Sequence, residues 1–276
     1  SAVAAITAAG SSAEPAPTEM AIVDYDVEAL EATTMFNTEE GGDPDAPLTE
    51  EQISHFLVEG YIPLPGILDA DHIELLKNDV DQVTLDRADA HANKLPQPNN
   101  VSYEHMGKLC SHPPTVNKVK QLMRAYGNGR DDFAMHHINA SRLDAGAGAA
   151  AWHQDYHCAA DVFDRSQLMV HVFFYLNGLD GKVGDLMCMP RSQNAVMERP
   201  AFNQLWQDYE LPGSLTFGSK NPLPPGSAVI VHSALLHGRR AQPGGDASGD
   251  AAGAARHRSA VGIPRTAAGA GHASGA

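Results

Sequence analysis

The sequence has few cysteines, no basic residue in its first fifty positions and no long apolar run. Its three cysteines, Cys110, Cys158 and Cys188, share no CxxC spacing. This pattern excludes a disulfide framework and a cysteine-based zinc cluster, and it is typical of a reducing compartment. No apolar stretch approaches the ~18 residues of a transmembrane helix, so we expect no membrane span. The first basic residue is Lys77, whereas an organellar transit peptide is rich in arginine, so none is expected here.

Acidic residues dominate the charge balance. The 276 residues carry a formal net charge of −15 and a pI near 5.2, which disfavours nucleic acid and anionic membranes as partners. Residues 1–46 mix Ala, Ser, Pro, Asp and Glu and predict a largely disordered acidic arm, with a short helix around Val27–Met35, on which a protein partner could dock. Residues 243–276 are rich in Gly and Ala and cannot build much core. One main domain is therefore expected over residues 47–242, with a short strand around 256–263.

The order of the predicted elements is helices first and short strands afterwards. Thr49 and Asp69 have the character of helix caps, each followed by apolar residues at helical spacing, and 115–126 forms a further amphipathic segment. Residues 88–102 are polar and predict a loop. From residue 133 onward, strands are expected at Phe133–Asn139, Ala150–His157, Leu168–Leu176, Asp185–Met189, Ser214–Phe217 and Ala228–His232. This order predicts a helix-supported β-sandwich or jelly roll.

The chemistry centres on Trp152-His153-Gln154-Asp155. If this segment is a strand, its side chains alternate between faces, so His153 and Asp155 point the same way while Trp152 belongs to the core. A histidine and a carboxylate placed in this way can bind one metal ion and leave open positions for O2, provided that a second histidine completes the set. An HxD triplet alone also occurs by chance in many proteins.

Two histidines downstream could supply the third ligand. An apolar strand leads into His232 and then His237. The two positions differ by an odd number, so a continuous strand cannot direct both side chains inward. One is expected to be the ligand and the other structural.

Four segments of the chain form a recognisable order. They are Phe56-Leu-Val-Glu-Gly-Tyr-Ile-Pro-Leu-Pro-Gly66, Trp152-His153-Gln154-Asp155, Gly184-Asp-Leu-Met-Cys-Met-Pro190-Arg-Ser-Gln193 and His232-Ser-Ala-Leu-Leu-His237-Gly238. Together they resemble the phytanoyl-CoA dioxygenase-like family of Fe(II)- and 2-oxoglutarate-dependent oxygenases, in which the third segment reads Gly-x-Leu…Pro-Gly-Ser-His. The resemblance spans residues 48–237. It implies a mainly β fold with supporting helices, namely a double-stranded β-helix (jelly roll, cupin-like).

The resemblance also implies the residues of the site. His153, Asp155 and His237 would bind Fe(II), and Gln154 would lie at the mouth of the site beside the co-substrate. The reaction would use O2 and 2-oxoglutarate, supported by ascorbate, on a small organic substrate. The carboxylate of Asp155 implies hydroxylation, since relatives that halogenate have a small residue at this position.

A 2-oxoglutarate enzyme needs a cation for the distal carboxylate, and arginine pairs with it in a bidentate manner. The resemblance places this arginine on the strand after the distal histidine. Arg258 has the matching context but lies 21 residues beyond His237, so an inserted loop is required, which loop-closure entropy tolerates. Arg256 is the second candidate, and Arg239 and Arg240 are too close to the ligand on its own strand.

Other functions and residues stay open from the sequence. The chain could be a non-catalytic jelly-roll relative that acts as a structural or binding subunit, or a cupin-like protein with another metal and no 2-oxoglutarate. His136 and His137 lie on a predicted strand beside the site, and we expect the inward one to line the pocket without contacting metal. His157 shares a face with the HxD residues and is expected at the substrate entrance.

Overall fold

The computed structural model describes residues 43–126, 129, 131–155, 169–194, 211–218 and 220–242, together with the backbone of 257–266. Most of the predicted acidic arm, including the helix expected at Val27–Met35, lies outside these residues. The helices are α2 (Glu50–Glu59), α3 (Ala70–Ala92), α4 (Glu104–Leu109) and α5 (Pro113–Tyr126), with short 3-10 turns at Asn100–Ser102 and Ser192–Asn194. Within this part of the chain, no helix combines the length and the apolar character needed to cross a membrane.

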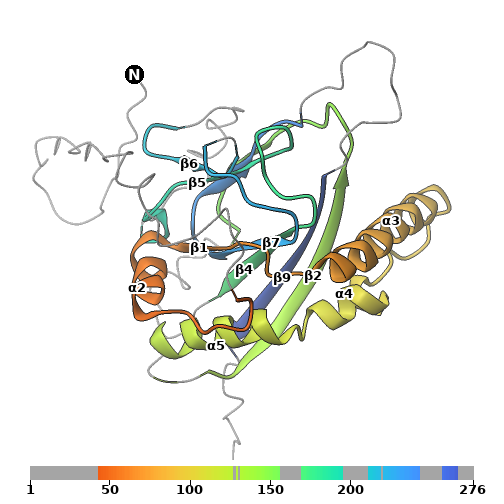
Figure 1. The fold of residues 1–276 in the computed structure, drawn as a ribbon. Coiled ribbons are helices and arrows are strands. Elements are labelled where there is room, and N and C mark those ends of the chain that lie inside the picture. The colour runs from red at the N-terminus through yellow and green to blue at the C-terminus, as the bar shows by residue number, and fades with distance from the viewer. Residues whose placement is uncertain are drawn as a thin grey trace, which may run out of the picture.

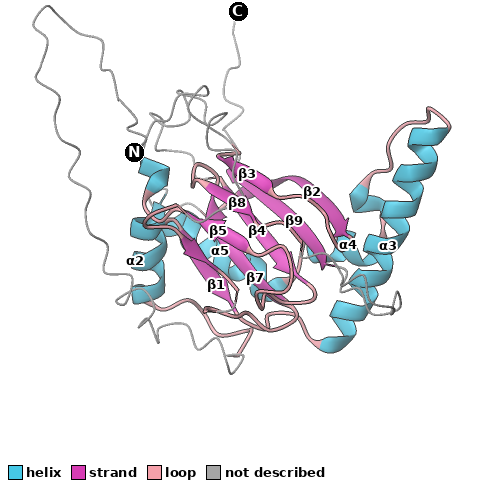
Figure 2. Ribbon diagram, turned by 90° about the horizontal axis from the view of Figure 1, so that it is seen from above, coloured by secondary structure: helices cyan, strands magenta, loops and turns pink. Residues whose placement is uncertain are grey.

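Two antiparallel sheets form the body of the molecule (Figures 1 and 2). The larger has the order β1-β7-β4-β9-β2 and the smaller the order β3-β8-β5-β6. Their strands are β1 (Tyr61–Leu64), β2 (Phe133–Leu143), β3 (Ala150–His153), β4 (Val170–Tyr175), β5 (Leu186–Cys188), β6 (Leu215–Thr216), β7 (Ser227–His232), β8 (His237–Arg239) and β9 (His257–Thr266). The expected mainly β jelly roll with supporting helices is confirmed.

The larger sheet separates two apolar cores. Successive side chains of β4 and β7 alternate between them, as the pleat of a strand requires. Phe174 and Ile230 belong to the core beneath the helices, whereas Tyr175 and Val231 belong to the core between the two sheets. Figure 1 shows α3 and α5 along the outer side of this sheet, so the opposite side is left to face the smaller sheet and the site.

Local sequence accounts for where the first helices begin. Thr49 caps α2 with a reciprocal capping box, in which its side chain accepts from the Gln52 N–H and the Gln52 side chain accepts from the Thr49 N–H. Gly60 ends the helix at φ 87°, a left-handed conformation that costs glycine little. Asp69 caps α3 through the N–H of His72. The caps at Thr49 and Asp69 were correctly predicted.

α3 is longer than the sequence predicted, and the loop assigned to 88–102 was wrong in its first part. The helix continues to Ala92 because tertiary contacts support its last turns. The guanidinium of Arg87 donates to the carbonyl of Ala140 and to the side chain of Asn139, both on β2, and Ala90 is buried. Polar composition alone did not show these contacts.

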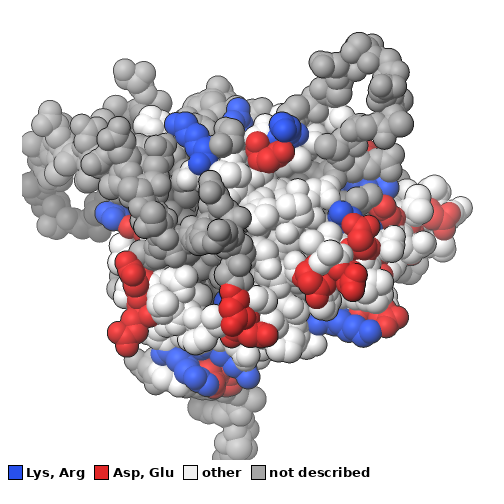
Figure 3. Space-filling model, viewed as in Figure 1, with Lys and Arg blue, Asp and Glu red and all other residues white. Residues whose placement is uncertain are grey.

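β2 likewise extends beyond its predicted end at Asn139 to Leu143, because β9 pairs with it along its length. β9 occupies His257–Thr266, where a short strand around 256–263 was expected. On the face shown in Figure 3, acidic and basic side chains are interspersed. The net charge of the chain therefore does not form a patch of one sign on this face.

Candidate metal centre

His153, Asp155 and His237 come together where the smaller sheet meets the loop after β3. β3 and β8 pair antiparallel with His153 opposite His237, which brings the two imidazoles to 4.3 Å between ring centres. β3 ends at His153, so the strand expected to continue through Asp155 was wrong at this point, and Asp155 lies in a bend. The ligating atoms of the three residues nevertheless all lie within 4.8 Å of one another.

The distances between the donor atoms suit one octahedral metal ion. Nε2 of His153 lies 3.4 Å from Oδ1 of Asp155, and Nε2 of His237 lies 3.5 Å from Oδ2. Adjacent donors on an octahedral ion with bonds of roughly 2.1 Å would be ~3 Å apart. Two imidazoles and one carboxylate on one side leave the other coordination positions open, which is the donor set of non-haem Fe(II) oxygenases. The residues present therefore fit such an ion.

Backbone carbonyls orient both imidazoles. Nδ1 of His153 lies 2.7 Å from the carbonyl oxygen of Ala151, and Nδ1 of His237 lies 2.9 Å from that of Leu235. A carbonyl oxygen only accepts, so each Nδ1 must carry the hydrogen, and each Nε2 is left with its lone pair directed at the centre. A metal-binding histidine is usually held in this way.

The electrostatics of the triad favour an anionic carboxylate beside a neutral His237, whereas the carboxylate shifts His153 toward its charged form. Burial would raise the pKa of Asp155, but the neighbouring His153, His237 and His171 outweigh burial and lower it well below its usual range. Burial and the nearby His153 lower the pKa of His237 to about 4. For His153, burial lowers the pKa, yet contact with Asp155 reverses the balance and raises it. A cation at this place would be attracted by the carboxylate without displacing a proton from His237 near neutral pH.

A fourth side chain, His171, borders the triad and was missed by the sequence analysis. It lies on β4 with its Nδ1 3.3 Å from Oδ2 of Asp155, and only 1% of its side chain is exposed. Burial lowers its pKa to about 3. The signal in the sequence was a single histidine within the apolar run Val170–Tyr175, since a polar group placed there must find a partner inside the protein.

The structure separates the two downstream histidines. His232 ends β7 in the larger sheet, and His237 begins β8 in the smaller one, because the chain turns between them. Nδ1 of His232 accepts from the N–H of Ala234 at 3.0 Å, and its ring lies 5.9 Å from that of Tyr126. Only His237 lies with His153 and Asp155, as the resemblance implied.

Gln154 is buried, and its side chain supports the chain leading to His237. Its amide nitrogen donates to the carbonyl of Ala234 at 2.5 Å and lies 3.5 Å from that of Ser192. The hydroxyl of Ser192 in turn accepts from the N–H of Leu236 at 2.7 Å. Gln154 and Ser192 thus hold the backbone immediately before the ligand. A position of Gln154 at the mouth of the site, beside a co-substrate, stays a prediction.

Of the four arginine candidates, the structure describes the side chains of Arg239 and Arg240 but only the backbone of Arg258. Arg258 stands on β9 at the register position opposite Arg142 of β2, but its side chain lies outside the described residues, as does all of Arg256. Arg239 ends β8 and donates to the carbonyl of Gly148 at 2.8 Å, whereas Arg240 is exposed. The assignment of Arg258 as the carboxylate-binding residue therefore stays a prediction.

Of the two histidines on β2, His137 is the one that approaches the site. The charge of Asp155 acts on its pKa, although burial lowers that pKa overall. Nδ1 of His136 lies 2.7 Å from Nδ1 of His137. His157 and Cys158 lie outside the described residues, so their expected roles are not addressed.

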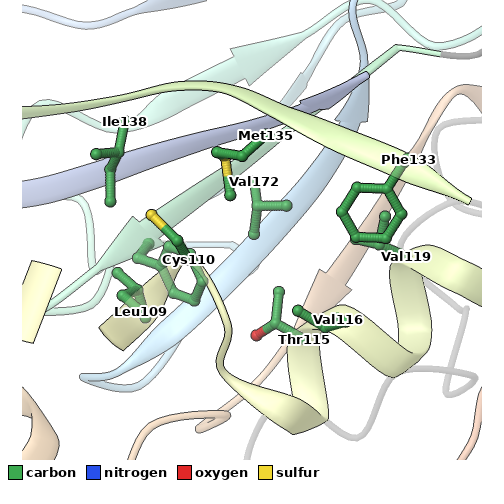
Figure 4. Close-up of a pocket in the computed structure, with 10 residues that line it drawn as sticks. Leu109, Cys110, Thr115, Val116, Val119, Phe133, Met135, Ile138 and Val172 are labelled. Atoms are coloured by element: carbon green, nitrogen blue, oxygen red, sulfur yellow. The ribbon is translucent and has the colours of Figure 1, made fainter. Parts of the chain in front are cut away.

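An apolar cavity lies on the other side of the larger sheet. Its walls come from α4, α5, β2 and β4, with Cys110, Thr115, Met135 and Val172 among the residues drawn in Figure 4. Val172 belongs to the core beneath the helices, so the sheet separates this cavity from the triad. A cavity of about 20 Å³ holds roughly one water molecule, and it is therefore not a pocket for an organic substrate.

Comparisons with solved structures show which fold the chain shares. EctD from S. alaskensis, solved with 2-oxoglutarate and 5-hydroxyectoine, has a TM-score of 0.58 at 17% identity, and the match covers 83% of this chain and 80% of EctD. EvdO2 from Micromonospora carbonacea var. aurantiaca, complexed with 2-oxoglutarate, has a TM-score of 0.55 at 14% identity, covering 80% and 91%. The α-ketoglutarate-dependent carbocyclase SnoK has a TM-score of 0.56 at 12% identity, covering 80% and 85%. At these identities the likeness shows the shared jelly-roll fold.

The family is shown by the sequence itself. The profile of the family described as phytanoyl-CoA dioxygenase (PhyH) matches residues 56–242, which is more than half of the chain. This protein belongs to the phytanoyl-CoA dioxygenase family of Fe(II)- and 2-oxoglutarate-dependent oxygenases. The search among curated proteins found no match.

Proposed function

We propose that the protein is an Fe(II)- and 2-oxoglutarate-dependent dioxygenase that hydroxylates a small organic substrate. The observation that carries this proposal is the convergence of His153, Asp155 and His237, with their ligating atoms within 4.8 Å. The family match and the 2-oxoglutarate complexes of EctD and EvdO2 support the choice of co-substrate.

The chain's contribution would be to bind and orient. His153 and His237 would hold the ion through Nε2, and Asp155 would hold it through one carboxylate oxygen. When bound, Fe(II) supplies the activation of O2: one oxygen atom enters the substrate C–H bond as a hydroxyl, the other enters succinate, and 2-oxoglutarate loses CO2. The carboxylate of Asp155 would hold the ion where a halide would otherwise bind, which favours hydroxylation over halide transfer.

The type of reaction is the least constrained part of this proposal. Among proteins of the same fold, SnoN is described as an epimerase and SnoK as a carbocyclase. Both are described as non-haem and α-ketoglutarate-dependent, so the identity of the product must come from a measurement.

The co-substrate needs a cation for its distal carboxylate, and Arg258 on β9 is the candidate. Its neighbour in the sheet, Arg142, already pairs with Asp81 at 3.4 Å. Replacing Arg258 with Ala should raise the 2-oxoglutarate concentration needed for half-maximal turnover. An effect of Arg256→Ala alone would transfer the assignment to Arg256.

The experiment that tests the function measures O2-dependent formation of succinate from 2-oxoglutarate with Fe(II), with and without ascorbate. It is run with a panel of small organic substrates, and mass spectrometry tests each product for a gain of one oxygen. Asp155→Ala should abolish turnover and metal binding, and His232→Asn is the matched control that should retain both. Metal binding without any 2-oxoglutarate binding or succinate would instead support a non-catalytic jelly-roll relative.

A further inference from the structure

His171 lies directly against the carboxylate of the triad. Its Nδ1 is 3.3 Å from Oδ2 of Asp155, whereas Oδ1 faces Nε2 of His153 at 3.4 Å. His171 is not one of the three residues whose ligating atoms cluster within 4.8 Å. It contacts Asp155 at Oδ2, the oxygen that Nε2 of His237 also faces, at 3.5 Å.

The position of this imidazole is set by its surroundings. β4 is a central strand of the larger sheet, between β7 and β9. The ring of His171 stacks on that of Phe173 at 5.7 Å between centres, and it lies 6.4 Å from the ring of His237. With 1% of the side chain exposed, water cannot take over the role of a partner for the carboxylate from this side.

The chemistry of the contact specifies the tautomer. The 3.3 Å approach of Nδ1 to Oδ2 is a close polar contact and not a formed hydrogen bond; because a carboxylate only accepts, Nδ1 can bond to it only in the tautomer that carries its hydrogen on Nδ1. A carboxylate that binds a metal through one oxygen gains in rigidity when its other oxygen is held, and such outer contacts commonly change metal affinity by about 10–100-fold. Asp155 has particular need of this support because it lies in a bend rather than in the ladder of β3.

We propose that His171 is a positioning residue, which holds Oδ2 of Asp155 through Nδ1–H and thereby fixes the carboxylate between His153 and His237. This inference rests on the proposed metal centre and adds a residue to it. It does not make His171 a ligand.

Two substitutions distinguish a positioning contact from a packing role. Asparagine carries its Nδ2 on Cγ, where histidine carries Nδ1, so His171→Asn can retain the donor. His171→Gln has equal polarity but places its nitrogen one bond further out. His171→Phe keeps a ring without any donor. His232→Asn, at a half-buried histidine outside the triad that contacts Tyr126 and Ala234, is the control for the loss of an imidazole.

The readout is the affinity for Mn(II), measured by anaerobic calorimetry on the full chain, with thermal unfolding of each apo variant as the test of folding. We expect His171→Phe and His171→Gln to bind Mn(II) about 10–100-fold more weakly and His171→Asn and His232→Asn to stay within a few fold of the wild type. If His171→Phe does not fold, the Asn and Gln variants still decide the question.

Two results would overturn the inference: wild-type affinity in His171→Gln, or an equal loss in His171→Asn and His171→Gln. Failure of the wild-type chain itself to bind Mn(II) or Fe(II) would instead overturn the proposed function, so the two failures are distinguishable.

Discussion

Arg191 adopts a left-handed backbone conformation, with φ 65°. It lies in the segment Pro190-Arg-Ser-Gln193, which is similar to the family's Pro-Gly-Ser-His. Glycine stands at this position in that pattern, and glycine adopts such a conformation at little cost. Here the arginine side chain forms a bidentate ion pair with Glu59 at the end of α2, with distances of 2.6 to 3.1 Å. The N–H of Arg191 also donates to the carbonyl of Glu59 at 3.0 Å.

The substitution Arg191→Gly therefore changes two opposing terms. Relief of the left-handed strain stabilises the fold by about 1 kcal/mol, part of which is lost to the greater freedom of glycine in the unfolded chain. Loss of the guanidinium leaves the Glu59 carboxylate, whose side chain is only 10% exposed, without this cation. Breaking a fully buried pair costs about 3–5 kcal/mol, and the half-exposed guanidinium reduces this to roughly 2–3 kcal/mol. The ion pair outweighs the strain, and we expect a net destabilisation of about 1–2 kcal/mol.

Urea denaturation of wild type, Arg191→Gly and Arg191→Asn measures this balance. Asparagine tolerates the left-handed conformation but carries no charge, so it should lose stability in the same way as glycine. In the background Glu59→Gln, the effect of Arg191→Gly should shrink or change sign, because the charged partner is gone. A glycine variant as stable as the wild type, or more stable, would refute the reasoning that the ion pair outweighs the strain.

Three further outcomes are expected. Burial lowers the pKa of His232 to about 4, whereas a histidine in the unfolded chain has a pKa near 6.5. As the pH falls below about 6.5, the unfolded chain therefore takes up a proton that the folded chain does not, and the fold loses stability until the pH reaches about 4. The loss is at most about 3 kcal/mol, before it is reduced for the partial exposure of the side chain. His232→Leu should flatten the dependence of the urea midpoint on pH over this window, and an unchanged slope would contradict the assignment. A Cβ on Gly178, at φ 75°, would lie 2.4 Å from the carbonyl oxygen of Leu223, whereas a Cβ on Gly146, at φ 79°, would meet nothing within 4 Å. Gly178→Ala should therefore lower the free energy of unfolding clearly more than Gly146→Ala. Equal losses by urea denaturation would show that the contact with Leu223 is unimportant. Mn(II) at 100 times its Kd should stabilise the wild type by about 2.7 kcal/mol, raising the Tm in a scan that EDTA reverses, and Asp155→Ala should show no such rise.

Local patterns were sufficient for much of the fold. The caps at Thr49 and Asp69 and the alternating strands were predicted because they depend on residues close together in sequence. The ends of α3 and β2 were not predicted, since the partners of Arg87 on β2 and the strand β9 lie more than fifty residues away from the elements they support. Contacts of this kind leave no mark in the local sequence.

The site likewise has features that local sequence predicted and features that depend on tertiary contacts. The sequence by itself determined that His153 and Asp155 could share one metal, because residues two apart keep a common side even where β3 ends and the chain bends. The odd spacing of His232 and His237 predicted that only one of them faces the site, but its premise of one continuous strand was wrong, because the chain turns between β7 and β8. Only the tertiary structure decided the rest: the turn after β7 moves His237 to the other sheet and opposite His153, and β4 places His171 against Asp155. The physical reason is that sheet pairing joins residues separated by tens of positions, and such proximity is a property of the folded chain.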